Sequence, residues 1–97
     1  MLPPFARGRE TVDAAVRGYK EINLRALRLL EPGGHLMTFS CSHHVSDALF
    51  EEICRDAAVD AGVSVRVRDI LTQADDHPVL LEVPETRYLK GRLLQAL

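Results

Sequence analysis

The sequence has no tryptophan and two cysteines, and aromatic residues make up only 5% of its 97 positions. Two cysteines cannot build a framework of several disulfides, so we expect free thiols and a cytoplasmic protein. So few aromatics disfavour a stand-alone RNA-binding module that works by base stacking. No apolar run is long enough to span a bilayer, and Met1 is not followed by the pattern of a signal peptide.

An excess of charge of one sign is also missing. Fourteen acidic and twelve basic residues give a net charge of −2, which provides no general attraction to nucleic acid. Only Lys20 and Lys90 among the basic residues are lysines. The arginine excess suits phosphate contacts, but it equally fits a bias in genomic base composition. The length fits one small domain.

Apolar periodicity and turn residues predict an α/β chain with two main helices and three strands. Residues 1–9, punctuated by proline and glycine, are expected to form a loop. A helix is predicted over 10–30, a buried strand over 35–40, and a helix capped by Ser46 and ended by Gly62. An alternating edge strand over 63–68, a polar loop over 72–78, an extended piece over 79–83 and a strand over 88–96 complete the chain.

Several short motifs occur in a specific order, although each is weak alone. They are GYKEIN (18–23), PGG (32–34), TFSCS (38–42), DHPV (76–79), PE (84–85) and YLKG (88–91). Together they resemble the C-terminal end of bacterial class I S-adenosylmethionine-dependent 23S rRNA cytosine-C5 methyltransferases of the large ribosomal subunit. The resemblance covers essentially the whole chain. It implies that residues 1–97 are one partial domain, the C-terminal half of a Rossmann-like catalytic domain.

The resemblance also implies an order of strands. The last of the three would run antiparallel and lie between the other two. The strand over 35–40 would then be an open edge, because the strand that normally pairs with it is missing. An open edge can pair with a second copy, so a homodimer, or pairing with the missing N-terminal half, is expected.

The parts of the family that hold the methyl donor are not found in this sequence. No Gly-rich strand-to-helix turn occurs, and the family pattern Asp-Pro-Pro-x-Phe is replaced by Leu2-Pro3-Pro4-Phe5. The intact family uses S-adenosylmethionine and acts on rRNA, whereas this chain alone is expected to bind no cofactor. Two interpretations follow, and enzymatic activity is left open. The chain is a fragment of an active methyltransferase, or a catalytically dead remnant that serves as an oligomerisation or binding module.

Cys41 is the candidate catalytic residue. A thiolate that adds to C6 of cytosine makes C5 nucleophilic, and this covalent route needs a cysteine beside the base. Cys41 stands in the Ser-Cys-Ser stretch where the family has its nucleophile, between a predicted strand and a helix N-terminus that favours the thiolate. The alternative is a half-buried small residue that ends a strand.

The remaining candidates carry weaker signals. By resemblance, Lys20, Tyr19, Pro3 and Pro4 would contact the substrate; the alternatives are core packing for Tyr19 and a solvated helix face for Lys20. Cys54 is predicted to be a packed core thiol. The cluster of Cys41, His43 and His44 lacks a clear metal-ligand spacing, so no metal is expected.

Overall fold

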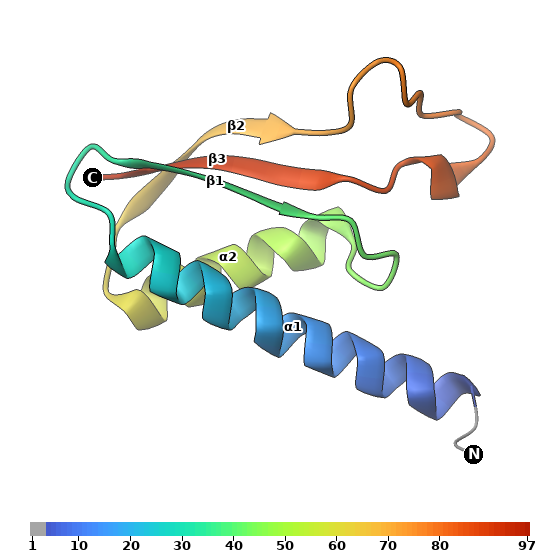
Figure 1. Cartoon of the computed structure of the whole chain (residues 1–97), viewed down its shortest axis with the longest axis horizontal. Coiled ribbons are helices and arrows are strands. Elements are labelled where there is room, and N and C mark those ends of the chain that lie inside the picture. Colours follow the sequence, from blue (N-terminus) through green and yellow to red (C-terminus); the bar gives the residue numbers. More distant parts are fainter. Residues whose placement is uncertain (1–3) are drawn as a thin grey trace.

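The computed structural model describes the backbone of residues 4–97 and the side chains of residues 11–97 other than Glu85. Its elements follow the predicted alternation of helix and strand (Figure 1). They are α1 (Pro4–Arg28), β1 (His35–Ser40), α2 (Asp47–Ala61), β2 (Val65–Leu71), the 3-10 turn η1 (Pro84–Thr86) and β3 (Lys90–Ala96). The α/β class is therefore confirmed.

The first helix is longer than the sequence predicts. Helix α1 begins at Pro4 rather than near residue 10, so the predicted loop is wrong from Pro4 onward. Proline disrupts a helix interior but suits the first helical position, where its missing N–H would have had no partner. Pro3, predicted to contact substrate, lies outside the described residues, as does the side chain of Pro4.

The three strands form a sheet in the order β1-β3-β2, with β3 antiparallel to both neighbours. This arrangement is the one that the resemblance implies. The register pairs Ser40 with Lys90 and Phe39 with Gly91, so the end of β1 lies beside the start of β3. Both β1 and β2 are edge strands, and β2 carries a bulge between Val67 and Asp69.

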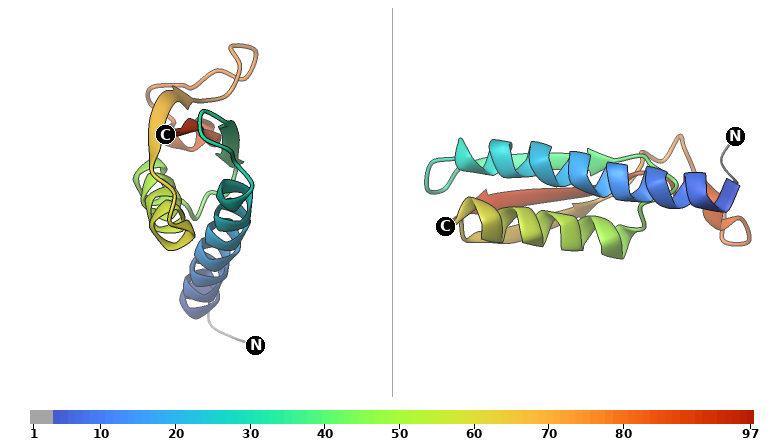
Figure 2. Two further views of the ribbon diagram at one scale, coloured as in Figure 1. Left: turned by 90° about the vertical axis from the view of Figure 1, so that its left-hand side faces the viewer. Right: turned by 90° about the horizontal axis from the view of Figure 1, so that it is seen from below.

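Both helices pack on the same face of the sheet (Figure 2). No described helix covers the opposite face, and for this reason the prediction that 35–40 is a buried strand is wrong. Met37 is 59% exposed and Phe39 40% exposed, while the alternate side chains of β1 point toward the helices. The predicted extended piece over 79–83 is also wrong, since only an isolated bridge joins Leu80 to Val83.

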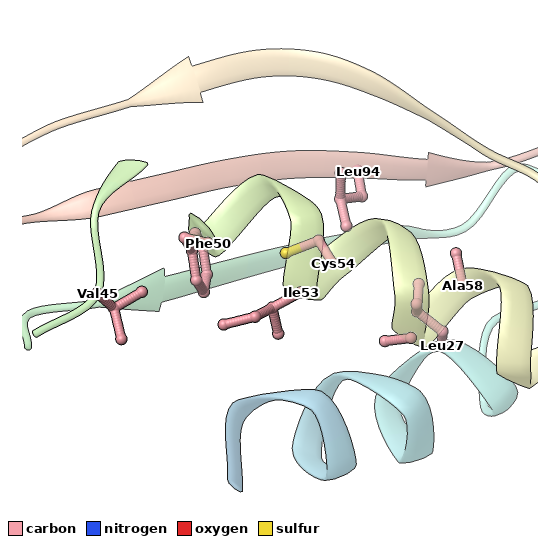
Figure 3. Packing of buried hydrophobic residues seen from close by; sticks show 8 residues of the cluster. Leu27, Val45, Phe50, Ile53, Cys54, Ala58 and Leu94 are labelled. Atoms are coloured by element: carbon pink, nitrogen blue, oxygen red, sulfur yellow. The ribbon is translucent and has the colours of Figure 1, made fainter. Parts of the chain in front are cut away.

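The core lies between the helices and the inner face of the sheet (Figure 3). Its buried members are Leu27, Val45, Phe50, Ile53, Cys54, Ala57, Ala58 and Leu94. The predicted caps of α2 are confirmed. Ser46 Oγ accepts a hydrogen bond from Leu49 N, and Gly62, at φ 70°, donates its N–H to carbonyls of the last turn. Ser46 thus fixes where α2 starts, directly after the loop that carries Cys41, and Gly62 fixes where it ends.

An ionic cluster fastens the first turns of α2 to β3. Arg92 is 1% exposed, and its guanidinium donates to both carboxylate oxygens of Asp47, at 2.9 and 2.8 Å. It also donates to Glu51 Oε1 at 3.1 Å and to the Gly91 carbonyl at 2.8 Å. The hydrogen bonds from Arg92 hold the pKa of Asp47 below its ordinary value. Strand β3 and the N-terminal turns of α2 therefore form one unit.

Candidate functional site

Cys41 directly follows β1 and is exposed. The loop from β1 to α2 lies at one end of the sheet (Figure 1). The N-terminal turn of α2 and the start of β3 approach the same end of the sheet. A reactive side chain placed here is fixed by the sheet and remains accessible to a large substrate. This is where open α/β sheets usually bind their ligands.

The two serines beside Cys41 brace its loop. Ser40 Oγ, on a side chain only 2% exposed, accepts from Ser42 N at 3.3 Å, and Ser42 Oγ accepts from His44 N at 3.2 Å. The Ser42 carbonyl accepts from Val45 N at 3.3 Å. Local bonds of this kind suit hydroxyl side chains in turns. The Ser-Cys-Ser pattern is thus explained as a nucleophile candidate between two turn-forming residues.

A buried lysine crosses from β3 to this loop. Lys90 is 5% exposed, and its Nζ donates to the carbonyl oxygens of Ser42 and Tyr88, both at 2.7 Å. Burial lowers the pKa of Lys90, against the opposing attraction of Cys41 and Asp47. The sequence gives no role to Lys90. Its only signal there is membership of the YLKG motif.

A groove of about 550 Å³ opens beside the same loop. His43, two residues after Cys41, lies in its wall, together with Asp47, Arg87 and Lys90. Most of its apolar lining comes from the segment before β3, namely Val79, Leu80, Leu81 and Pro84, and Val45 adds to it from the loop before α2. This volume is in the range of small-molecule sites, and the mixed apolar and cationic wall suits a planar group with a phosphate.

Polar side chains order the segment that forms the outer wall of the groove. Gln73, 7% exposed, donates to the Thr86 carbonyl and accepts from Leu89 N at 3.4 Å. Thr86 Oγ1 accepts from Leu80 N at 2.8 Å and donates to the Val83 carbonyl at 2.6 Å. Neither residue stands out in the sequence, because a single Gln or Thr in a polar loop carries no periodic signal.

The structure gives Tyr19 and Lys20 partners on α2 rather than on the Cys41 loop. The Tyr19 ring packs edge-on against Phe50, with 6.0 Å between centroids, in the manner of the core-packing alternative. Lys20 Nζ lies 2.7 Å from Asp60 Oδ2, near the C-terminal end of α2, whereas the Cys41 loop precedes its N-terminal end. The hydrogen bond to Asp60 raises the pKa of Lys20. A substrate role for either residue remains a prediction.

Cys54 is the packed thiol that the sequence predicts. It is 4% exposed, and burial raises its pKa to about 11, so it is protonated at neutral pH. A second groove, of about 590 Å³, runs between α2 and the strands β2 and β3, with Cys54 in its lining. A neutral thiol there offers no nucleophile, so the groove beside Cys41 is the stronger candidate site.

Over the part of the chain that is described, no group of three or more His, Cys, Asp or Glu residues is arranged to hold a metal ion. None of the described helices is long and apolar enough to cross a membrane. Arg66 and Arg68 both donate to Gln95 Oε1, at 3.0 Å each, on the exposed side of the sheet. These arginines lie on β2, the edge opposite to β1.

Comparisons with known proteins match almost the whole chain. It is 46% identical over 94 residues to "Ribosomal RNA large subunit methyltransferase I" of Aeromonas salmonicida and of Aeromonas hydrophila, which covers 97% of this chain and 24% of each relative. The protein of the same name from Vibrio vulnificus is 48% identical over 89 residues, covering 92% and 22%. The chain thus spans about a quarter of the length of these relatives. No protein-family model matches it.

A solved structure shares the fold. The crystal structure of SMU.776, a candidate methyltransferase complexed with SAH, superposes with a TM-score of 0.67 at 14% sequence identity. The match covers 82% of this chain and 20% of that one. The small sheet and its two helices are therefore an arrangement also found inside a larger α/β protein.

Proposed function

We propose that this chain is the nucleophile-bearing part of an S-adenosylmethionine-dependent rRNA cytosine-C5 methyltransferase, the C-terminal half of its catalytic domain. Strong similarity to relatives named as rRNA methyltransferases, over a quarter of their length, supports a methyltransferase fragment. The observation that carries the finer proposal is Cys41, exposed at the end of β1 and held in a loop braced by Ser40 and Ser42.

The chemistry assigned to Cys41 is addition to the base. Its thiolate attacks C6 of a cytosine, and the electron pair of the C5–C6 double bond moves to C5 and the adjoining ring system. C5 would then take the methyl group from the sulfonium of the donor, which would leave as the neutral thioether. Loss of the C5 proton to a base and expulsion of the Cys41 thiolate from C6 restore the C5–C6 double bond and free the enzyme. The groove beside the loop has room for a pyrimidine, and Arg87 and Lys90 supply positive charge near a nucleotide phosphate.

The described residues do not fit a site for the methyl donor. Donor binding in this fold relies on a glycine-rich turn between a strand and a helix, where backbone N–H groups come close to the ligand. The turn from β1 to α2, residues 41–46, contains no glycine. The donor would therefore be held by another segment of the polypeptide or by another chain, and this chain alone is proposed to be inactive.

A chimera tests the function directly. The matching segment of the Aeromonas salmonicida relative would be replaced by this chain, and 5-methylcytidine in rRNA would be measured by nucleoside mass spectrometry. The chimera is expected to methylate rRNA at C5 of cytosine. Cys41→Ala in the chimera should lower the rate by at least about a thousandfold, because removal of a covalent nucleophile eliminates the reaction route.

Cys54→Ala is the matched control, since it removes the other thiol of the chain without touching the Cys41 loop. It should leave methylation largely intact. A folded chimera without activity would contradict the proposal and favour a catalytically dead remnant. Methylation that survives in Cys41→Ala would exclude Cys41 as the nucleophile, and a methyl group found elsewhere on the base would exclude C5 chemistry.

The second candidate, a remnant that acts as an oligomerisation module, is favoured by the edge and bare face of β1. We propose that two copies pair along β1, where Met37 and Phe39 are exposed beside unpaired backbone groups. Light scattering should then give a mass of about twice 10.8 kDa. Met37→Lys should shift the mass toward the monomer, because charge on an edge strand opposes pairing.

Leu29→Lys is the control for this shift, because Leu29 is 84% exposed just beyond α1 and away from β1. It should leave the mass unchanged. A monomeric mass for the unmodified chain over the whole concentration range would contradict the homodimer. The mass measurement does not decide the methyltransferase proposal, which depends on Cys41.

A further inference from the structure

Lys90 is buried without an ion-pair partner among the side chains that the structure describes. Its ammonium donates to two main-chain carbonyls, those of Ser42 and Tyr88. The nearby carboxylate of Asp47 is already held through both oxygens by Arg92. Desolvating an ammonium is costly, and a neutral donor could bond to a carbonyl without that cost. A charged residue at this position therefore suggests a use for the charge itself.

The geometry ties Lys90 to the loop of the nucleophile. Ser40 and Lys90 face each other across β1 and β3, so Cys41 is the residue directly beyond this pair. The bond from Lys90 Nζ to the Ser42 carbonyl fixes the residue on the other side of Cys41. An ammonium has three donors, and two are used by these carbonyls. The cation is also close enough to feel a negative charge on Cys41.

We propose that Lys90 is the positioning residue for Cys41: its ammonium holds the Cys41 loop through the Ser42 carbonyl and places a positive charge at that loop. The inference rests on the proposed function, because it takes Cys41 as the nucleophile. Arg87, Asp47, His43 and His44 are the other ionisable groups at this end of the sheet. Of these, Asp47 is paired with Arg92, which it shares with Glu51, and the others are not buried as Lys90 is.

The test measures thiol reactivity and needs neither RNA nor methyl donor. Iodoacetamide labelling of Cys41 in the full chain would be followed by peptide mass spectrometry from roughly pH 6 to 10. In Lys90→Met, which keeps an unbranched stem but loses the ammonium, labelling at neutral pH should slow about tenfold. The midpoint of the pH profile should also move upward. Lys90→Arg, which restores the charge, should recover part of the rate.

Two controls separate this effect from general loosening. Arg25→Met removes one positive charge from an exposed site on α1 and should leave the profile unchanged. Cys54, buried with a pKa of about 11, should stay unlabelled in every folded variant. Faster labelling of both thiols would mean that the variant has lost its fold. The proposal is then tested on the unmodified chain.

In the unmodified chain, Cys41 should react faster with iodoacetamide at neutral pH when the protein is folded than when it is unfolded in urea, because only the folded chain places the Lys90 ammonium at its loop. An equal or slower rate in the folded chain would overturn the proposal. A folded Lys90→Met variant with the unmodified pH profile would also overturn it. An inactive chimera, by contrast, would count against the methyltransferase function and leave these labelling results as they are.

Discussion

Arg92→Met is expected to lower the free energy of unfolding by about 3 kcal/mol, although the substitution keeps most of the apolar stem. Arg92 is fully buried and is the only side chain that bonds to Asp47 and Glu51 together among the interactions described. Its loss leaves two neighbouring carboxylates to repel each other where α2 meets β3. It also removes the donor to the Gly91 carbonyl.

Thermal unfolding followed by circular dichroism checks this expectation. For a domain of this size, the loss corresponds to a decrease in Tm of about 15 °C. Arg55→Met is the matched control, because Arg55 approaches the same Glu51 from the solvent, at 3.9 Å with 65% of its side chain exposed. Exposed pairs of this kind contribute less than about 1 kcal/mol. Equal melting temperatures for the two variants would show that the buried cluster does not hold α2 to β3.

Acid should reduce the difference in the free energy of unfolding between Arg92→Met and the unmodified chain. The pKa of Asp47 lies below its ordinary 3.8 in the folded chain because Arg92 hydrogen-bonds its carboxylate. A lowered folded pKa adds stability above the unfolded pKa, and that stability is lost as the pH falls through the folded value. The gap in stability should therefore be full at neutral pH and narrow below about pH 4. If this difference in the free energy of unfolding stayed constant in acid, the carboxylate of Asp47 would not be its cause.

The sequence predicted the parts of the fold that depend on local pattern. The presence of α1, the caps Ser46 and Gly62 and the order of helices and strands follow from spacing and turn chemistry. The position of β3 between β1 and β2 does not follow from pattern, and only the resemblance to methyltransferases supplied it. Pairing between distant strands leaves no signal in one sequence when both strands are short and apolar.

The errors have physical causes of a similar kind. An apolar strand such as β1 predicts burial on both faces, but burial depends on whether a second layer covers the sheet. At the candidate site, the position of Cys41 was predictable from its place after a strand. The roles of Lys90 and Arg92 were not, because each depends on partners more than forty residues away in the chain, Ser42 and Asp47.

Gly91, also in the YLKG motif, is the site of the second large loss of stability that we expect. A Cβ added at Gly91 would lie 2.5 Å from the Phe39 ring and 3.1 Å from Leu71 Cβ. Phe39 is the residue paired with Gly91 across β1 and β3, so its ring covers the glycine. The backbone of Gly91 has no positive φ, and glycine is therefore required here for space rather than for conformation.

Gly91→Ala is expected to lower the free energy of unfolding by about 2 kcal/mol, because the Phe39 ring must leave its place and Leu71 limits where the backbone can shift. Urea unfolding would measure the loss. In a Phe39→Ala background the same substitution should cost little or even stabilise, since alanine suits a strand better than glycine once the space is empty. The coupling free energy between positions 39 and 91 should thus approach the whole loss in free energy of unfolding caused by Gly91→Ala alone.

The same cycle tests how β1 and β3 are held in register at the end of the sheet that carries Cys41. If the ring over Gly91 fixes that register, Gly91→Ala should also disturb the Ser40–Lys90 pair next to it and raise the labelling of Cys54, which is buried in the core. Equal costs of Gly91→Ala in the two backgrounds would show that Phe39 does not fill this space in solution. The Cys41 loop would then depend on Lys90 and the two serines for its position.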